Sequence, residues 1–135
     1  RARRRGPGID FDVHLEPTPI MGDPSTLERA ITNLLDNAVK FSPTGGTITV
    51  RLEDSTLTII DEGPGIEEED LPLIFDRFYR SDKARNTPGT GLGLAIVAHT
   101  ASAHGGTVRA TNEPGAGAKF VLKLSRIDEL AEPLA

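Results

Sequence analysis

The chain has 135 residues, a formal net charge of −5 and no cysteine. Its length allows one domain with a hydrophobic core, and the lack of cysteine excludes disulfides, thiolate zinc sites and cysteine nucleophiles. The acidic charge argues against nucleic acid as the main partner, and no stretch approaches the roughly 18 apolar residues of a membrane helix.

The N-terminal region begins at Arg1 without a methionine and lacks the apolar core of a signal peptide. We therefore expect a piece of a longer protein, with residues 1–8 as the basic end of a linker. Residues 9–15 alternate apolar and polar side chains, which predicts a half-buried strand with Leu15 inward and His14 exposed.

A helix is predicted from Asp23-Pro24, a capping residue followed by proline at the first helical position. Its core stripe is Leu27, Ile31, Leu34 and Ala38. A second stripe, turned by ~100° from the first, consists of Asn33, Asn37 and Lys40. One helix thus packs a core and presents two amides and an ammonium beside it.

A hairpin follows the break at residues 43–46, with strands at 47–52 and 57–60 and a turn at Asp54-Ser55. Asp61 ends the second, apolar strand and precedes Gly63 and Gly65. Residues 67–70 look like an acidic helix start that leads into the apolar Leu71, Ile74, Phe75 and Phe78.

The second half of the chain opens with a polar segment, residues 80–90, which lacks an apolar anchor and is predicted to be a mobile loop. A helix is expected from 91 to 104, with Leu92, Ile96 and Val97 inward, and it ends at Gly105-Gly106. Strands are expected at 107–111 and 119–124, followed by a tail at 126–135.

Three motifs carry chemistry. Asn37 can give Mg²⁺ a neutral oxygen ligand and Lys40 can neutralise phosphate charge, although the pair of asparagines could also be ordinary surface residues. Asp61 can accept a hydrogen bond from an exocyclic amine, or can simply begin a turn. Gly89-Thr90-Gly91-Leu92-Gly93 precedes a helix, whose N-terminal N–H groups bind anions. His99 and His104 do not converge on a metal and are interpreted as structural.

The order of these motifs resembles the catalytic ATP-binding domain of two-component sensor histidine kinases. Asn33 to Asn37 is similar to that family's asparagine box, Asp61 with Gly63 and Gly65 to its first glycine box, and Phe75-Asp76-Arg77-Phe78-Tyr79-Arg80 to its phenylalanine box. Gly89, Gly91 and Gly93 are similar to the second glycine box, and Gly115 with Gly117 to a weaker third one. The phenylalanine box and the short loop after it resemble membrane sensor kinases with transcription-regulating partners, mycobacterial kinases among them.

The resemblance implies an α/β sandwich with a mixed, mostly antiparallel sheet and helices on one face, over residues 9–125. It implies transfer of the γ-phosphoryl group of Mg-ATP to a histidine on a separate dimerisation domain, and from there to a response regulator. The fragment itself is expected to be monomeric, as a cytoplasmic domain of a membrane protein. No histidine here is followed by an acidic residue, so the acceptor histidine is expected to be absent.

The resemblance also assigns the site residues. Expected catalytic residues are Asn33, Lys40 and Arg77, and the expected magnesium ligand is Asn37. Expected nucleotide contacts are Asn33, Asn37, Lys40, Phe41, Asp61, Gly63, Gly65, Ile66, Phe78, Arg80, Gly89, Thr90, Gly91, Leu92, Gly93 and Leu94. A serine kinase of the anti-sigma type and an ATP-gated ATPase of the same superfamily are the alternatives. The ATPases place a glutamate where this chain has Asn33, and an amide cannot act as the base toward water.

Overall fold

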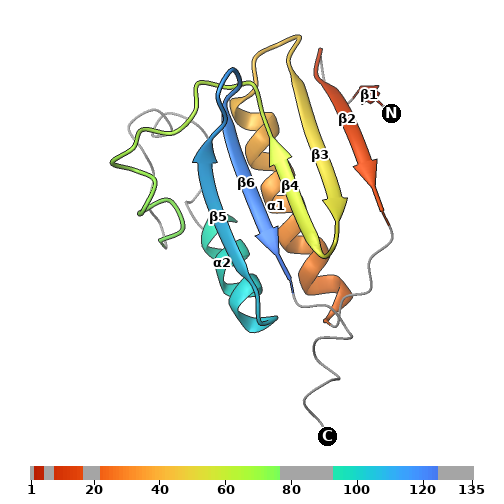
Figure 1. Ribbon diagram of the computed structural model, residues 1–135, viewed down its shortest axis with the longest axis vertical. Helices are drawn as coiled ribbons and strands as arrows, with labels where there is room; N and C mark the ends of the chain where they lie inside the picture. The colour runs from red at the N-terminus through yellow and green to blue at the C-terminus, as the bar shows by residue number, and fades with distance from the viewer. Residues whose placement is uncertain (1, 5–7, 17–21, 77–92, 125–135) are drawn as a thin grey trace, which may run out of the picture.

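The computed structural model of the protein describes residues 2–4, 8–16, 22–76 and 93–124. Within this part of the chain, a single sheet in the order β1-β2-β3-β4-β6-β5 carries two helices on one face (Figure 1). Only β2 and β3 pair in parallel. The predicted α/β sandwich with a mixed, mostly antiparallel sheet is therefore confirmed. The strands are β1 Ala2–Arg4, β2 Asp10–Leu15, β3 Thr47–Glu53, β4 Thr56–Ile60, β5 Thr107–Asn112 and β6 Ala118–Lys123.

Helix α1 spans Pro24–Phe41 and buries Ala30, Leu34 and Ala38 against the sheet. Asp23 is its N-cap residue, but its carboxylate accepts hydrogen bonds from the hydroxyl groups of Ser25 and Thr26. The predicted helix start at Asp23-Pro24 is therefore confirmed, with the Asp23 side chain bonded to these hydroxyl groups. These hydroxyls also lower the pKa of the Asp23 carboxyl.

Helix α2 spans Gly93–Ala103 and packs beside α1 over the same face of the sheet (Figure 1). Its buried side includes Val97 and Ala101, whereas Ile96, expected to point inward, is only partly buried. The helix ends as predicted, because Gly105 has a φ of +71° and Gly106 N–H donates to the Ala101 carbonyl at 2.8 Å. Neither described helix is both long and apolar enough to cross a membrane.

The hairpin between β3 and β4 turns at the predicted residues. Asp54 and Ser55 have φ angles of 53° and 61°, and two successive positive values match the twist of a tight two-residue hairpin. The turn directs β4 back through the core, with Leu57 and Ile59 buried, so that the strand ends directly at Asp61. This strand is what places a carboxylate at the edge of the core.

Two predicted features are wrong. Leu15 is 60% exposed: it is the last residue of β2, and it is not among the described hydrophobic residues that pack against the core. Residues 67–76 form successive turns rather than a helix, with bonds such as Leu73 N–H to the Asp70 carbonyl. Pro72 explains this, since it donates no backbone hydrogen bond and disfavours helical geometry at the residue before it.

β1 was not predicted, because three arginine-rich residues carry no strand pattern. The predicted loop at residues 80–90, the start of the second helix at 91 and the tail at 126–135 lie outside the described residues. The division of the chain near residues 8 and 125 stays a proposal.

Candidate functional site

Asp61 lies at the centre of the candidate site and is 2% exposed. Its Oδ1 accepts hydrogen bonds from the backbone N–H groups of Gly63, at 2.9 Å, and Ala118, at 3.0 Å. Burial raises the pKa of the Asp61 carboxyl, against the lowering effect of these two bonds. Both bonds end on Oδ1, so within the described part of the chain Oδ2 is left to accept from an incoming donor.

Two glycines allow close packing around the Asp61 carboxylate because they have no side chains. A Cβ on Gly117 would lie 2.3 Å from Asp61 Oδ1 and 2.6 Å from the backbone of Gly63. A Cβ on Gly63 would lie 2.4 Å from the carbonyl oxygen of Phe41, at the end of α1. Glycine at Gly63 therefore allows the loop that follows β4 to pack directly against the last residue of α1.

We call residues 61–66 the base loop, after the base contact that the sequence predicts for Asp61. Two side chains that were not predicted as site residues hold this loop. Asn112 Oδ1 accepts from Ile66 N–H at 2.7 Å, and Asn112 Nδ2 donates to the Ile66 carbonyl at 2.8 Å. Glu62 Oε1 accepts from Thr47 N–H at 3.0 Å. No local sequence signal identifies these partners, because the Asn112 contact spans 46 positions.

The amide face of α1 is present as predicted. Among the described residues, the buried Asn33 Nδ2 has no hydrogen-bond partner. The Asn33 side chain lies beside Gly93, where a Cβ would stand 3.7 Å from Oδ1. Asn37 is half-buried one turn further along. Lys40 is exposed, with Nζ 5.4 Å from the centre of the Phe41 ring. A buried amide without a partner is costly, so Asn33 fits a site that a ligand completes.

Helix α1 brings the motifs together. The base loop packs against Phe41 at its C-terminal end, and Gly93 lies against Asn33 eight residues earlier, a span of about 12 Å along the helix. Ile66 and Leu94 are partly buried and pack against the core. Seven predicted site residues lie outside the described residues: Arg77, Phe78, Arg80, Gly89, Thr90, Gly91 and Leu92.

His104 has the structural role predicted for it. Its Nε2 accepts from Asp23 N–H at 3.2 Å and its Nδ1 lies 2.8 Å from the Thr100 carbonyl, so Nδ1 carries the proton. The imidazole thus joins the start of α1 to the end of α2. His99 is exposed on α2.

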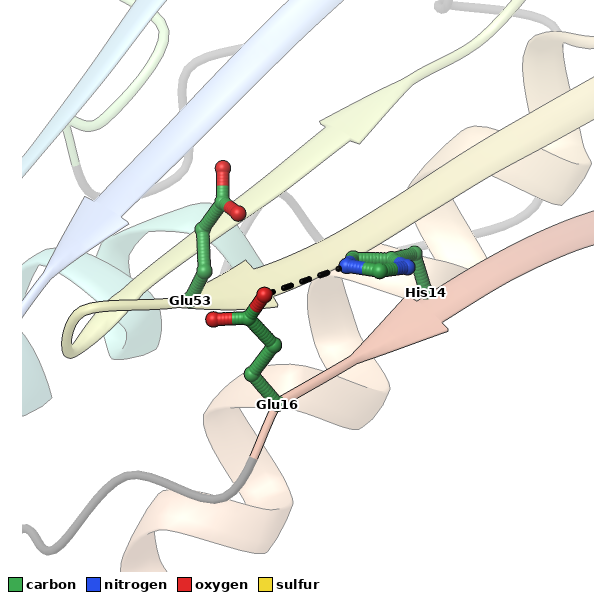
Figure 2. Close-up of side chains that lie close together, drawn as sticks. All are labelled: His14, Glu16 and Glu53. Carbon is green, nitrogen blue, oxygen red and sulfur yellow. Dashed lines mark ion pairs between the residues drawn. The ribbon is translucent and has the colours of Figure 1, made fainter.

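Two other features of the described residues were not predicted. A groove of about 1060 Å³ is lined, in the part of the chain that the structure describes, by residues that were not predicted to contact the nucleotide: Ser25, Thr26, Arg29, Phe75, Asp76, Ala95, Ile96, His99 and Thr100. Figure 2 shows His14, Glu16 and Glu53, whose ligand atoms lie within 4.8 Å of one another. All three are exposed, His14 pairs with Glu16 at 3.5 Å, and Arg51 lies opposite His14 on the same face, so we assign no metal there.

Comparison with known proteins points to one family. A model described as "Histidine kinase-, DNA gyrase B-, and HSP90-like ATPase" matches residues 22–127. The signal transduction histidine-protein kinase/phosphatase MprB of Mycolicibacterium smegmatis is 46% identical over 140 residues, covering 96% of this chain and 28% of that protein. MprB of Mycobacterium sp. (strain KMS) is 49% identical over 114 residues, covering 81% and 22%. The chain thus spans about a quarter of the length of these relatives.

Solved structures give the same result. A mycobacterial sensor histidine kinase MprB matches with a TM-score of 0.78 and 43% identity, over 89% of this chain and 86% of that one. The ATP binding domain of PrrB from Mycobacterium tuberculosis matches with a TM-score of 0.61 and 34% identity, over 86% and 80%. Both are mycobacterial proteins, in agreement with the resemblance to mycobacterial kinases.

Proposed function

Because the chain belongs to the histidine kinase-, DNA gyrase B- and HSP90-like ATPase family and is the ATP-binding catalytic domain of a sensor histidine kinase, we propose that it binds Mg-ATP along α1 and donates the γ-phosphoryl group to a histidine on a separate domain. One observation carries this proposal: α1 has the buried Asp61 beside its C-terminal end and, near its middle, the buried Asn33 amide, which has no partner among the described residues. A nucleotide lying along the helix would give both groups a partner.

The base lies at Asp61 in this proposal. Asp61 Oδ2 accepts a hydrogen bond from the exocyclic amine of adenine, while Gly63, Gly65 and Ile66 let the backbone curve beneath the ring. Guanine presents a carbonyl oxygen at the same place, which the carboxylate repels. Two backbone N–H groups hold Oδ1, so the carboxylate cannot turn away from the wrong base without losing them.

The phosphates lie over the middle of α1. Asn33 Nδ2 donates to a phosphate oxygen, and the Asn37 amide oxygen is a ligand for Mg²⁺, which favours a few neutral or charged oxygens beside the substrate phosphates. The bound metal would neutralise phosphate charge, as would Lys40 and Arg77. The other proposed contacts are Phe41, Phe78, Arg80, Gly89, Thr90, Gly91, Leu92, Gly93 and Leu94.

Phosphoryl transfer is favoured over hydrolysis because Asn33 is an amide, which cannot take a proton from an attacking water. The relatives named above are histidine kinases, and MprB is named kinase/phosphatase. The anti-sigma kinase and ATP-gated ATPase alternatives are therefore not favoured.

The acceptor lies outside the described histidine set. Both ring nitrogens of His104 are engaged, and none of the three histidines precedes an acidic residue. The proposed partners are the protein's own helical dimerisation and phosphoacceptor domain and, indirectly, a response regulator. ATP as the donor places this domain on the cytoplasmic side of a membrane sensor.

The test combines this chain with radiolabelled ATP, Mg²⁺ and a separately expressed acceptor domain. We expect acid-labile, alkali-stable label on the acceptor, and none when its histidine is replaced. Acid-stable label would indicate a serine kinase. Phosphate release at the same rate without an acceptor would indicate an ATPase.

A further inference from the structure

The side-chain amide of Asn112, the last residue of β5, forms the two hydrogen bonds that a backbone residue forms with its partner in a sheet. Its amide both accepts from Ile66 N–H, at 2.7 Å, and donates to the Ile66 carbonyl, at 2.8 Å. This two-way exchange is the pattern of a hydrogen-bonded residue pair in an antiparallel sheet. The exposed side chain therefore fixes the end of the base loop, which no strand pairs with among the described residues.

Gly65 contributes to the same contact between Asn112 and Ile66. It has a φ of +81°, which glycine adopts without strain, and a Cβ there would lie 2.8 Å from Asn112 Oδ1. The turn at Gly65 directs the Ile66 backbone toward the Asn112 side-chain amide. Because Gly65 has no side chain, this amide can lie close to it. Glycine at Gly65 thus allows the contact between Asn112 and Ile66, and this contact in turn holds the turn at Gly65.

The hairpin between β5 and β6 holds both ends of the base loop. At the start of the loop, Gly117 N–H donates to the Asp61 carbonyl at 2.8 Å and Ala118 N–H donates to Asp61 Oδ1 at 3.0 Å. At its end, Asn112 holds Ile66. The hairpin itself is closed by Glu113 N–H, which donates to the Gly117 carbonyl at 2.8 Å.

We propose that Asn112 is a positioning residue for base recognition: by clamping Ile66, it keeps the base loop in the shape in which Asp61 reads the exocyclic amine. The inference rests on the proposed binding of ATP. Asn112 itself need not touch the nucleotide. Its effect comes from preorganisation, since a loop that is already ordered loses less freedom when the ligand binds.

The experiment compares Asn112→Ala with Thr111→Ala, an exposed neighbour on β5 that pairs with Lys119 of β6, whereas Asn112 bonds to Ile66. Hydrogen exchange of the Ile66 amide is measured without nucleotide. Affinities for ATP and for purine riboside triphosphate, which lacks the 6-amino group, are measured by calorimetry. Asn112→Ala should expose the Ile66 amide, weaken ATP about tenfold and reduce the discrimination between the two nucleotides. Thr111→Ala should do none of these.

Two further variants separate the clamp from general stability. Asn112→Asp keeps the size of the side chain and the acceptor for Ile66 N–H but sets a carboxylate against the Ile66 carbonyl, so it should also lose discrimination. Its thermal melt, measured beside that of Asn112→Ala, shows how much stability each variant loses. Gly65→Ala should cost less ATP affinity in the Asn112→Ala background than alone, because its contact with Oδ1 is gone.

The outcomes are distinct. Loss of Ile66 protection with unchanged discrimination for the amino group would overturn the positioning role and leave the proposed function intact. Equal weakening of both nucleotides by Asn112→Ala would show a merely structural role. No ATP binding by the unmodified chain would overturn the proposed function, and this inference with it.

Discussion

The two ends of the candidate site differ in how much of them the protein completes by itself. At the base end, Asp61 Oδ1, Glu62 and Asn112 all have backbone partners, and Gly117 and Gly63 are packed against their neighbours. On the α1 face, Asn33 Nδ2 is buried and has no partner in the part of the chain that the structure describes. A site whose shape is held by internal hydrogen bonds can discriminate between ligands. A buried polar group that lacks a partner gains a hydrogen bond when a ligand binds.

This contrast predicts different consequences of mutation. Changes at the base end should alter selectivity and stability together, because the same bonds serve both. Changes on the α1 face should alter ligand and metal dependence and leave the fold unaffected.

Gly117→Ala should have the largest effect. The new Cβ meets Asp61 Oδ1 at 2.3 Å and the Gly63 backbone at 2.6 Å. Oδ1 cannot move away without losing its bonds to two backbone N–H groups. We expect a loss of roughly 1–3 kcal/mol in the free energy of unfolding from overpacking. ATP affinity should fall more than a hundredfold, as measured by calorimetry below the melting temperature.

Gly115→Ala is the matched control in the same hairpin. Gly115 has a φ of +79° but no atom within 4 Å of an added Cβ. It should therefore lose about 1 kcal/mol of stability through backbone strain alone, with ATP affinity nearly unchanged. Similar ATP affinities for the two variants would mean that the base end is not preformed.

Asp61→Asn should change which base is preferred. The two N–H groups that hold Oδ1 require an acceptor, so the new amide oxygen takes that position and the NH₂ group takes the place of Oδ2. Two donors then face each other when adenine binds, and the variant should lose ATP affinity by about 10- to 100-fold. GTP, with a carbonyl in place of the amine, should bind relatively better.

The measurement is the ratio of ATP to GTP affinity for the unmodified protein and the variant. The ratio should be high in the first and fall in the second. Comparable affinities for ATP and GTP in the unmodified protein would show that Asp61 does not read the base.

Asn37→Ala tests the open end of the site. Removal of the amide oxygen should weaken ATP binding about tenfold in Mg²⁺ and hardly at all in EDTA. Because Asn37 lies within α1 and alanine is the better helix former, the free energy of unfolding should stay the same or rise by about 0.5 kcal/mol. Equal losses of affinity with and without Mg²⁺ would assign Asn37 a structural role.

The sequence allowed prediction of this architecture where local patterns determine it. The Asn33, Asn37 and Lys40 face follows from helical spacing, and buried Asp61 from an apolar strand that ends there. It failed at Leu15, because alternation along a strand does not show where the packing on the face of the sheet ends. It missed Asn112 because an exposed asparagine acquires its partner only when the sheet brings residues 46 positions apart together.

The smallest expected effect concerns pH and separates the charge of Asp61 from its shape. Burial raises the pKa of Asp61 in the folded protein above the ordinary value of 3.8 that applies to the unfolded chain. Between these two values the unfolded chain has lost the proton while the folded protein keeps it. Ionisation therefore favours unfolding, and the Asp61 contribution to stability falls as pH rises through this window.

Denaturant unfolding of the unmodified protein and of Asp61→Asn, at a series of pH values from 3.8 upward, measures this contribution. The amide has no proton to lose, so stability relative to the variant should decline with rising pH and level off once the folded carboxyl is ionised. ATP affinity should change in the opposite direction, because only the ionised carboxylate is a pure acceptor for the adenine amine. A difference in stability that is constant with pH would mean that burial does not disfavour the Asp61 charge, and that the base end is held by hydrogen bonding alone.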